Sequence, residues 1–227
     1  NVKYEVVSAS FFGDPNIGLY CCSSEELCFC GNLERKELEK LKNILKVEVF
    51  EVTISNTSFI GLLAAMNSNG IIIPHIIEEK ESKKLEKVCK ERDMNVLKLD
   101  TNYTAIGNLV LCNDSGAVLS PLFSRKEVRK IEDVLGVEVV QSSIADLMVV
   151  GSCGIATNKG CLLHRDSSEE NIKLVEDVLN VEADVGTLNF GSPFVGACGI
   201  ANSKGAIVGE GSTGPEITRL QEALGFL

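Results

Sequence analysis

The pattern of apolar and polar residues repeats along this chain. Residues 109–121 read LVLCNDSGAVLSP, two apolar runs joined by a short polar turn, and residues 63–74, 153–164 and 198–209 share that pattern. A glycine opens each copy and a second glycine follows nine residues later; the opening glycines are Gly61, Gly107, Gly151 and Gly196. Their spacings of 46, 44 and 45 residues indicate a repeat architecture with one structural unit per copy.

Each pair of apolar runs predicts a β-hairpin. Six residues after the opening glycine the four copies hold Asn67, Asn113, Thr157 and Asn202. Asn and Gly tolerate a positive φ, so we expect them to supply the left-handed backbone that tight hairpin turns require.

A helix and a third strand follow each hairpin. Apolar residues recur at intervals of three and four, which is typical of a helix with one buried face. The N-cap residues that precede these stripes are Ser124, Ser168 and Thr213. Glu127 and Glu216 complete capping boxes in two of them. A short apolar run after each helix, such as residues 137–141, predicts the third strand.

The two ends of the chain complete the pattern. The first unit opens with Ile17–Gly18 but replaces the turn by residues 23–26 and lacks the second glycine, so we expect its hairpin to differ in shape. The last helix has no third strand after it, whereas the strand at residues 2–7 precedes any hairpin. Pairing of that strand with the last unit would close a ring and remove exposed sheet edges.

We therefore predict an α/β fold: a five-fold pseudosymmetric α/β propeller closed by its N-terminal strand. Residues 1–227 would form a single domain of five strand-strand-strand-helix repeats of about 45 residues each. An open solenoid of the same units is the alternative, and the displaced N-terminal strand argues against it.

Composition narrows the possible partners. The formal net charge is −10, so the chain has no bulk attraction for phosphate backbones and favours basic protein surfaces.

No apolar run is long enough for a transmembrane helix, and the N-terminus shows no secretory signal. Nine cysteines, an odd number, indicate reduced thiols in an intracellular compartment.

The candidates for chemistry are weak, and we expect no catalytic residue, metal or cofactor. Cys28 and Cys30 would share one face of a strand, which makes a metal site conceivable, but no second ligand pair accompanies them. An enzymatic alternative would combine Cys198, His164 and Asp146. The polar turns suit a binding surface better; they carry Asn67, Asn113, Asp114, Asn158, Lys159, Asn202 and Lys204.

Three segments make the chain resemble the translation initiation factor 6 family. They are AIGNLVLCNDSGAVLSP (105–121), VGSCGIATNKGCLLH (150–164) and residues 181–216, which include NSKGAIVG and TGPE. The resemblance implies the pentein form of the propeller. It also implies a non-enzymatic protein that binds the large ribosomal subunit on its intersubunit face and sterically prevents association with the small subunit.

The resemblance further implies partners and a location. The family contacts a uL14-family ribosomal protein near the sarcin–ricin loop, and an elongation-factor-like GTPase with the Shwachman–Diamond syndrome protein releases it. A cytoplasmic monomer is expected, with a role in large-subunit biogenesis and a nuclear or nucleolar pool if the source is eukaryotic. A guanidine-modifying pentein hydrolase and a ring-shaped scaffold for another protein are the alternatives.

Particular residues match the ribosome-facing surface of the family. They are Gly18, Leu62, Asn67, Ser68, Asn108 and Cys153. Leu62 and Ser68 stand where eukaryotic relatives often carry Arg, and Cys153 stands where they carry Tyr. With the turn residues Asn113, Asp114, Asn158 and Lys159 they make up the predicted ribosome-binding set, and Asn108 is its principal member because an amide can both donate and accept.

Overall fold

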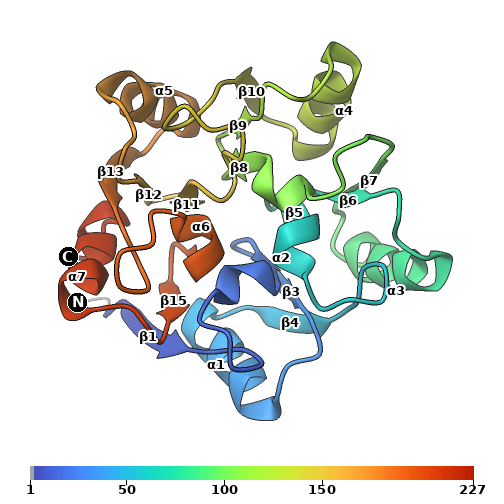
Figure 1. Ribbon diagram of the computed structural model, residues 1–227. Helices are drawn as coiled ribbons and strands as arrows, with labels where there is room; N and C mark the ends of the chain where they lie inside the picture. The colour runs from blue at the N-terminus through green and yellow to red at the C-terminus, as the bar shows by residue number, and fades with distance from the viewer. Residues whose placement is uncertain (1–2) are drawn as a thin grey trace.

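Five small sheets surround a central axis, and long helices form the perimeter (Figure 1). The computed structural model describes residues 3–227. Each sheet has three strands: an antiparallel hairpin and a third strand that pairs in parallel with the second hairpin strand. The mixed α/β fold with five-fold pseudosymmetry is therefore confirmed.

The strands, in the hydrogen-bonded order of each sheet, are β2 (Cys21–Ser23), β3 (Leu27–Cys30) and β4 (Glu48–Glu51); β5 (Ala65–Met66), β6 (Gly70–Pro74) and β7 (Asn95–Leu99); β8 (Val110–Cys112), β9 (Gly116–Leu119) and β10 (Glu138–Gln141); β11 (Gly154–Ala156), β12 (Gly160–His164) and β13 (Glu182–Gly186); and β14 (Gly199–Asn202), β15 (Gly205–Gly209) and β1 (Glu5–Ala9).

The helices fall into two groups. The perimeter helices are α1 (Arg35–Leu45), α3 (Glu79–Lys90), α4 (Arg125–Leu135), α5 (Glu169–Leu179) and α7 (Gly214–Ala223). The short helices near the axis are η1 (Ile17–Leu19), α2 (Ile60–Leu63), η2 (Ile106–Asn108) and α6 (Val195–Cys198). The predicted capping boxes at Ser124 and Thr213 are present, because each N-cap side chain accepts the backbone N–H three residues later.

The N-terminal strand closes the ring, as the sequence predicted. β1 pairs in parallel with β15, from Glu5 opposite Gly205 to Ala9 opposite Gly209. Tyr4 lies close to the C-terminal residues at that sheet (Figure 1), where the rings of Tyr4 and Phe226 stack with centroids 4.8 Å apart. Val2, which also belongs to the predicted strand, lies outside the described residues.

The core lies between neighbouring sheets. One of its five clusters joins Leu111 and Val118 of one sheet with Leu163 of the next and with Val175 and Leu179 of α5. The middle strands β3, β6, β9, β12 and β15 are buried along their whole length. Strands covered on both faces carry continuous apolar runs rather than an alternating pattern, which explains sequences such as GIIIP.

The opening glycines form a ring around the axis. A Cβ on Gly107 would lie 1.9 Å from the carbonyl oxygen of Gly61, and one on Gly18 would lie 2.2 Å from that of Gly196. The same relation holds for Gly61 and Gly151 with the preceding unit. Any side chain here would push two units apart, so glycine is required for contact between copies.

Our prediction of a positive φ at the hairpin turns is wrong. The second glycine of each copy instead allows close packing between a strand and a helix. None of the four Asn/Thr turn residues or their glycines has a positive φ. A Cβ on Gly116 would instead lie 2.0 Å from the carbonyl oxygen of Val178 at the end of a perimeter helix. The second glycines are needed because the strand and the perimeter helix approach each other closely at these positions.

The first hairpin does not differ in shape, so that prediction is also wrong. The last paired residues, Ser23 with Cys28 in the first hairpin and Cys112 with Ala117 in the third, each enclose four residues. The hydroxyl of Ser24 accepts the N–H groups of Glu26 and Leu27, in the manner of an Asn side chain. Leu27 stands in place of the glycine and belongs to the same buried cluster as Leu85 of α3.

Candidate functional site

The ring presents two faces. In every unit the inner hairpin strand runs from the opening glycine to the turn, so the glycines gather at one end of the central channel and the turns at the other. We call the end with Gly18, Gly61, Gly107, Gly151 and Gly196 the glycine face. We call the end with the turns at residues 24–26, 67–69, 113–115, 157–159 and 202–204 the turn face.

The structure does not bring the predicted ribosome-binding residues into one surface. Gly18, Leu62, Asn108 and Cys153 belong to the short segments around the glycine ring. Asn67, Ser68, Asn113, Asp114, Asn158 and Lys159 belong to the turn face.

Asn67 and Asn113 are buried and hold the ring together. The Asn113 side chain accepts the N–H groups of Ser115 and Gly116, and its Nδ2 donates to the carbonyls of Thr157 (3.0 Å) and Leu179 (2.8 Å). Asn67 does the same for its own turn and donates to Asn113 and Leu135. Each amide thus fixes its own turn, the next unit and a perimeter helix.

The other polar side chains of the turn face also join units. Asp114 accepts both the backbone N–H (2.7 Å) and the hydroxyl (2.8 Å) of Ser68, and it accepts Nδ2 of Asn158 (2.8 Å). Lys159 lies over the Tyr4 ring, with Nζ 4.0 Å from the centroid. The sequence could not reveal these bonds because every one connects different repeats.

The thiols that line the central channel are not activated for chemistry. The glycine end of the channel is a cavity of about 120 Å³ lined by glycines, apolar side chains and Cys21, Cys22 and Cys112. Burial raises the pKa of the Cys112 thiol to about 12 and that of Cys22 well above its ordinary value. All nine cysteines are free, and within residues 3–227 no group of three or more His, Cys, Asp or Glu side chains is placed to hold a metal.

The residues of the enzymatic alternative have other partners. The Cys198 thiol contacts the carbonyl of Phe194 (3.3 Å), and burial raises its pKa, although a nucleophile needs a lowered one. Nδ1 of His164 accepts the backbone N–H of Asp166 (3.0 Å), and burial lowers its pKa. The hydrogen bonds of Cys198 and His164 in residues 3–227 therefore do not couple the two side chains as thiol and base.

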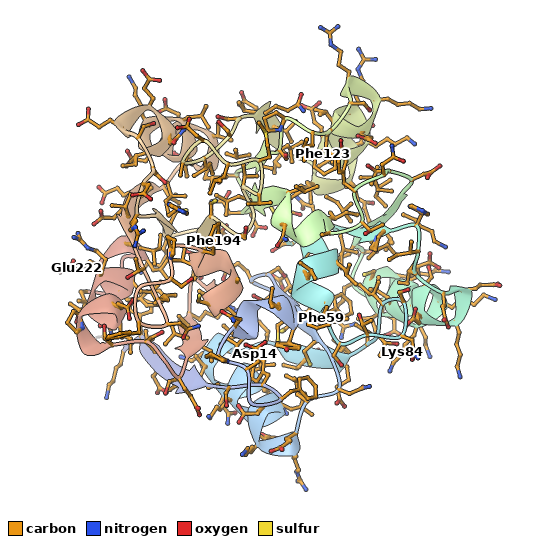
Figure 2. The ribbon with its side chains drawn as sticks, viewed as in Figure 1. Asp14, Phe59, Lys84, Phe123, Phe194 and Glu222 are labelled. Atoms are coloured by element: carbon orange, nitrogen blue, oxygen red, sulfur yellow. The ribbon has the colours of Figure 1, made fainter. Side chains whose placement is uncertain are left out.

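Large apolar side chains are exposed on the glycine face. Phe190 (83% exposed), Phe12 (62%), Met148 (44%), Tyr103, Phe59 and Phe194 lie in the segments that enter the glycine ring. Ile76 and Leu122 follow middle strands that return to this same face. Figure 2 shows Phe59 and Phe194 beside the short axial helices. Of the exposed large hydrophobic residues in the described chain only Leu227 lies elsewhere, so these side chains are concentrated on one face.

An aromatic group anchors part of that face. Tyr20 stacks on Phe59 and contacts Phe12, with ring centroids 5.3 Å apart in both pairs. Its hydroxyl donates to Asp14 (2.8 Å); burial and this carboxylate raise the Tyr20 pKa to about 12. Sequence reasoning did not single out these aromatic residues, because an apolar residue gives no signal of exposure in one sequence.

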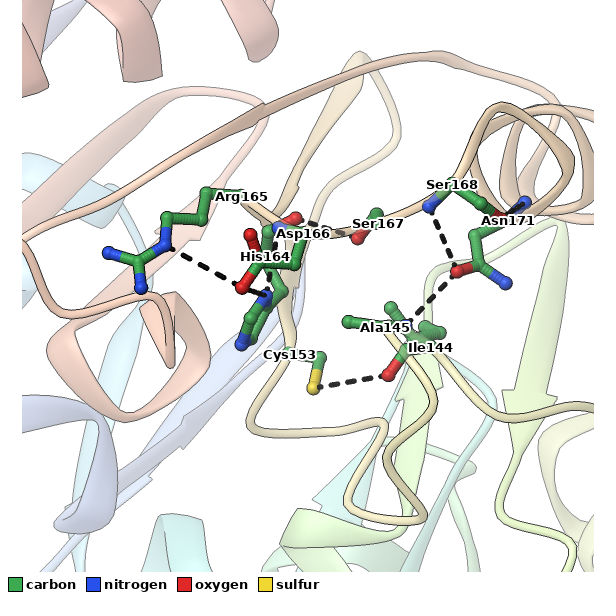
Figure 3. Close-up of polar contacts among 9 residues, drawn as sticks. All are labelled: Ile144, Ala145, Cys153, His164, Arg165, Asp166, Ser167, Ser168 and Asn171. Atoms are coloured by element: carbon green, nitrogen blue, oxygen red, sulfur yellow. Dashed lines mark hydrogen bonds and ion pairs between the residues drawn. The ribbon is translucent and has the colours of Figure 1, made fainter.

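Asn108 and Cys153 occupy different depths. Asn108 is half-buried at the end of η2, and its carbonyl accepts the Gly151 N–H (2.8 Å). Cys153 is fully buried under the loop at Ile144 and Ala145 (Figure 3), and burial raises its pKa to about 11. Asn171 fixes that loop by accepting the Ala145 N–H (3.0 Å). A partner on this face can reach Asn108 and Leu62 but not the Cys153 side chain.

Comparison with known sequences identifies the family of this chain. The family model described as "eIF-6 family" matches residues 6–223. The chain belongs to the eIF-6 family. It is 42% identical over 220 residues to "Translation initiation factor 6" of Pyrococcus horikoshii, covering 96% of this chain and 97% of that one. The protein of the same name from Saccharolobus solfataricus is 38% identical, with 95% and 97% covered.

Membership of the eIF-6 family indicates a function in translation. The family is not a family of enzymes. Among solved structures, Campylobacter jejuni agmatine deiminase overlaps 53% of the chain, with 16% identity and a TM-score of 0.34, a likeness too low to inform on function. None of the helices in residues 3–227 is long and apolar enough to cross a membrane.

Proposed function

We propose that this eIF-6 family protein binds the large ribosomal subunit through its glycine face and thereby prevents joining of the small subunit. The observation that carries the proposal is the concentration of exposed large apolar side chains on that face. Exposed large apolar side chains concentrated on one side of a protein are typical of a protein-docking site. The turn face, by contrast, uses its polar side chains for bonds between units.

The partner on the subunit would be a basic ribosomal protein of the uL14 family near the sarcin–ricin loop. The net charge of −10 favours encounter with such a partner over encounter with bare RNA. A bound ring would occupy the space that the small subunit needs, so inhibition is steric. Release by an elongation-factor-like GTPase with the Shwachman–Diamond syndrome protein, cytoplasmic action as a monomer and a role in biogenesis extend the same proposal.

Of the predicted contact residues, we assign Asn108 and Leu62 to this surface. Gly18 belongs to the ring of glycines at the same face. The buried side chains of Asn67, Asn113 and Cys153 leave no surface for a partner. Ser68, Asp114, Asn158 and Lys159 lie on the opposite face.

The test is co-sedimentation with purified large subunits in sucrose gradients, followed by addition of small subunits. We expect the wild-type protein to migrate with large subunits and to reduce the peak of whole ribosomes. Asn108→Arg should remain folded and lose at least tenfold in affinity, because a cation then meets a basic partner.

The matched control is Ser115→Arg, which adds the same charge at an exposed position of the turn face. It should bind as the wild type does. Equal loss in both variants, or no loss in Asn108→Arg, would contradict the glycine face as the docking surface.

A further inference from the structure

Helix α4 carries a cationic patch in an acidic protein. Arg125, Lys126, Arg129 and Lys130 are all exposed and fill its first two turns. None of them has an acidic group within 4.0 Å among residues 3–227. Figure 2 shows nitrogen-tipped side chains extending from α4 away from the ring.

The patch does not stabilise its own helix. Arg125–Arg129 and Lys126–Lys130 are like-charge pairs four residues apart, which repel. Cations in the first turn and acids in the last turn oppose the helix dipole, and α4 has two cations at its start and no basic residue in its last turn. Glu127 alone supplies an acid at the start, as part of the capping box.

The neighbouring helix α3 shows the opposite arrangement. Glu79 and Glu81 lie in its first turn and Lys87 and Lys90 in its last, as the dipole favours. Lys83 pairs with Glu79 at 2.6 Å. Lys83, Lys87 and Lys90 of α3 are therefore accounted for by helix stability, whereas the cations of α4 are not.

The patch adjoins the glycine face. The carbonyl of Leu135, the last residue of α4, accepts the side-chain N–H groups of Asn67 and Asn69 on the turn face. The first turns of α4 therefore lie at the opposite end, next to the exposed Leu122. The cations form the rim of the surface to which the proposed function assigns the ribosome.

We propose that Arg125, Lys126, Arg129 and Lys130 bind phosphate groups of an RNA backbone. Guanidinium and ammonium groups are the side chains that neutralise phosphates, and guanidinium does so through two parallel hydrogen bonds. A chain of net charge −10 is repelled by RNA as a whole, so an unpaired cluster of four cations provides local attraction. The inference rests on the proposed function, because RNA on the docked large subunit would be the phosphate source.

The experiment compares two variants of equal net charge. The first neutralises the patch (Arg125→Gln, Lys126→Gln, Arg129→Gln, Lys130→Gln), and the control neutralises α3 (Lys80→Gln, Lys84→Gln, Lys87→Gln, Lys90→Gln). Binding to purified large subunits is measured at several salt concentrations, and thermal unfolding verifies that both variants are folded. The same proteins are titrated into a labelled RNA oligonucleotide, with poly-glutamate as a competitor.

We expect the α4 variant to bind subunits roughly tenfold or more weakly at low salt, with the slope of log affinity against log salt shallower by about 3, since each phosphate contact contributes roughly 0.7 to 0.9. The α3 control should bind as the wild type does. Equal loss of affinity in both variants, or wild-type binding by the α4 variant, overturns the proposal. Displacement of the labelled RNA by poly-glutamate but not by unlabelled RNA also overturns it.

The two proposals fail separately. If the wild type does not bind large subunits, the proposed function fails, and the oligonucleotide titration decides the patch alone. Weaker RNA binding by the α4 variant than by the α3 control then supports the patch, and equal binding overturns it.

Discussion

At the scale of single residues, position in the ring decides what a side chain does. Asn113 is buried and donates its amide N–H groups to two carbonyls of the next unit, whereas Asn108 is half-buried on the glycine face. Glu216 at the start of α7 serves its own helix and also a loop: its carboxylate accepts N–H groups from Phe190, Gly191 and Thr213. One N-terminal acid thereby joins helix and loop.

Glu216 should make stability depend on pH. Burial raises its pKa, but the Thr187 hydroxyl and the backbone N–H groups outweigh burial and hold the pKa at about 2, against 4.5 for an ordinary glutamate. A lowered folded-state pKa contributes stability that is present above pH 4.5 and is lost as the pH falls toward 2. Glu216→Gln should cost roughly 0.5–2 kcal/mol at neutral pH, the range for a lost helix cap.

Urea denaturation between pH 2 and 6 measures this effect. The difference in free energy of unfolding between wild type and Glu216→Gln should shrink as the pH falls. Glu222→Gln removes the same charge from an exposed position of α7 and should show no such convergence. A difference that stays constant with pH would show that the carboxylate charge is not the source of the stabilisation.

At the scale of elements, perimeter helices of similar length serve different purposes. α3 and α4 both carry several cations, but only α3 has basic residues in its last turn, where the helix dipole favours them. The cations in the first turn of α4 oppose the dipole of the helix that holds them, as is expected of residues selected for contact with something else.

Reversal of one α4 charge should therefore stabilise the protein. Arg125→Glu places an acid in the first turn and removes a like-charge pair, so we expect a gain of about 0.3–1 kcal/mol. Lys90→Glu in the last turn of α3 should change stability in the opposite direction. Chemical denaturation of both variants measures the two effects, and a loss of stability in Arg125→Glu would refute the dipole argument for α4.

At the scale of the whole molecule, stability depends on closure. Each core cluster lies between two sheets, and the cluster between the last sheet and the first includes Ala9 of β1 with Cys28 and Leu41 of the first unit. β1 also covers β15, which would otherwise be an open edge. Neighbouring units share every core, so no unit can lose its partner without exposing apolar surface.

Removal of residues 1–9 tests closure. We expect a lower unfolding temperature and self-association through β15, measured by thermal unfolding and analytical ultracentrifugation. A permuted chain with these residues attached after Leu227 by a short linker should recover a monomer, because Tyr4 and Phe226 are already in contact. A truncated chain as stable as the wild type would contradict the role of β1.

The docking surface illustrates the limit of sequence reasoning. The resemblance to the family predicted Asn108, Leu62, Asn67 and Ser68 on one surface, whereas Asn67 and Ser68 lie on the turn face of the ring. The exposed Phe12, Phe59 and Phe190 gave no signal, since in sequence they are indistinguishable from core residues. Exposure is a property of the folded surface, and only the ring determines it.

The sequence by itself determined the number of repeats, the order of strands and helices, the caps and the displaced strand that closes the ring. These features are local or periodic, and hydrophobic spacing and turn residues encode them directly. The tertiary structure alone decided why Gly107 and Gly116 are glycines, where the Asn113 amide is used and which residues share a face. Each of those depends on the distance between copies 44 to 46 residues apart in the chain, which no local pattern records.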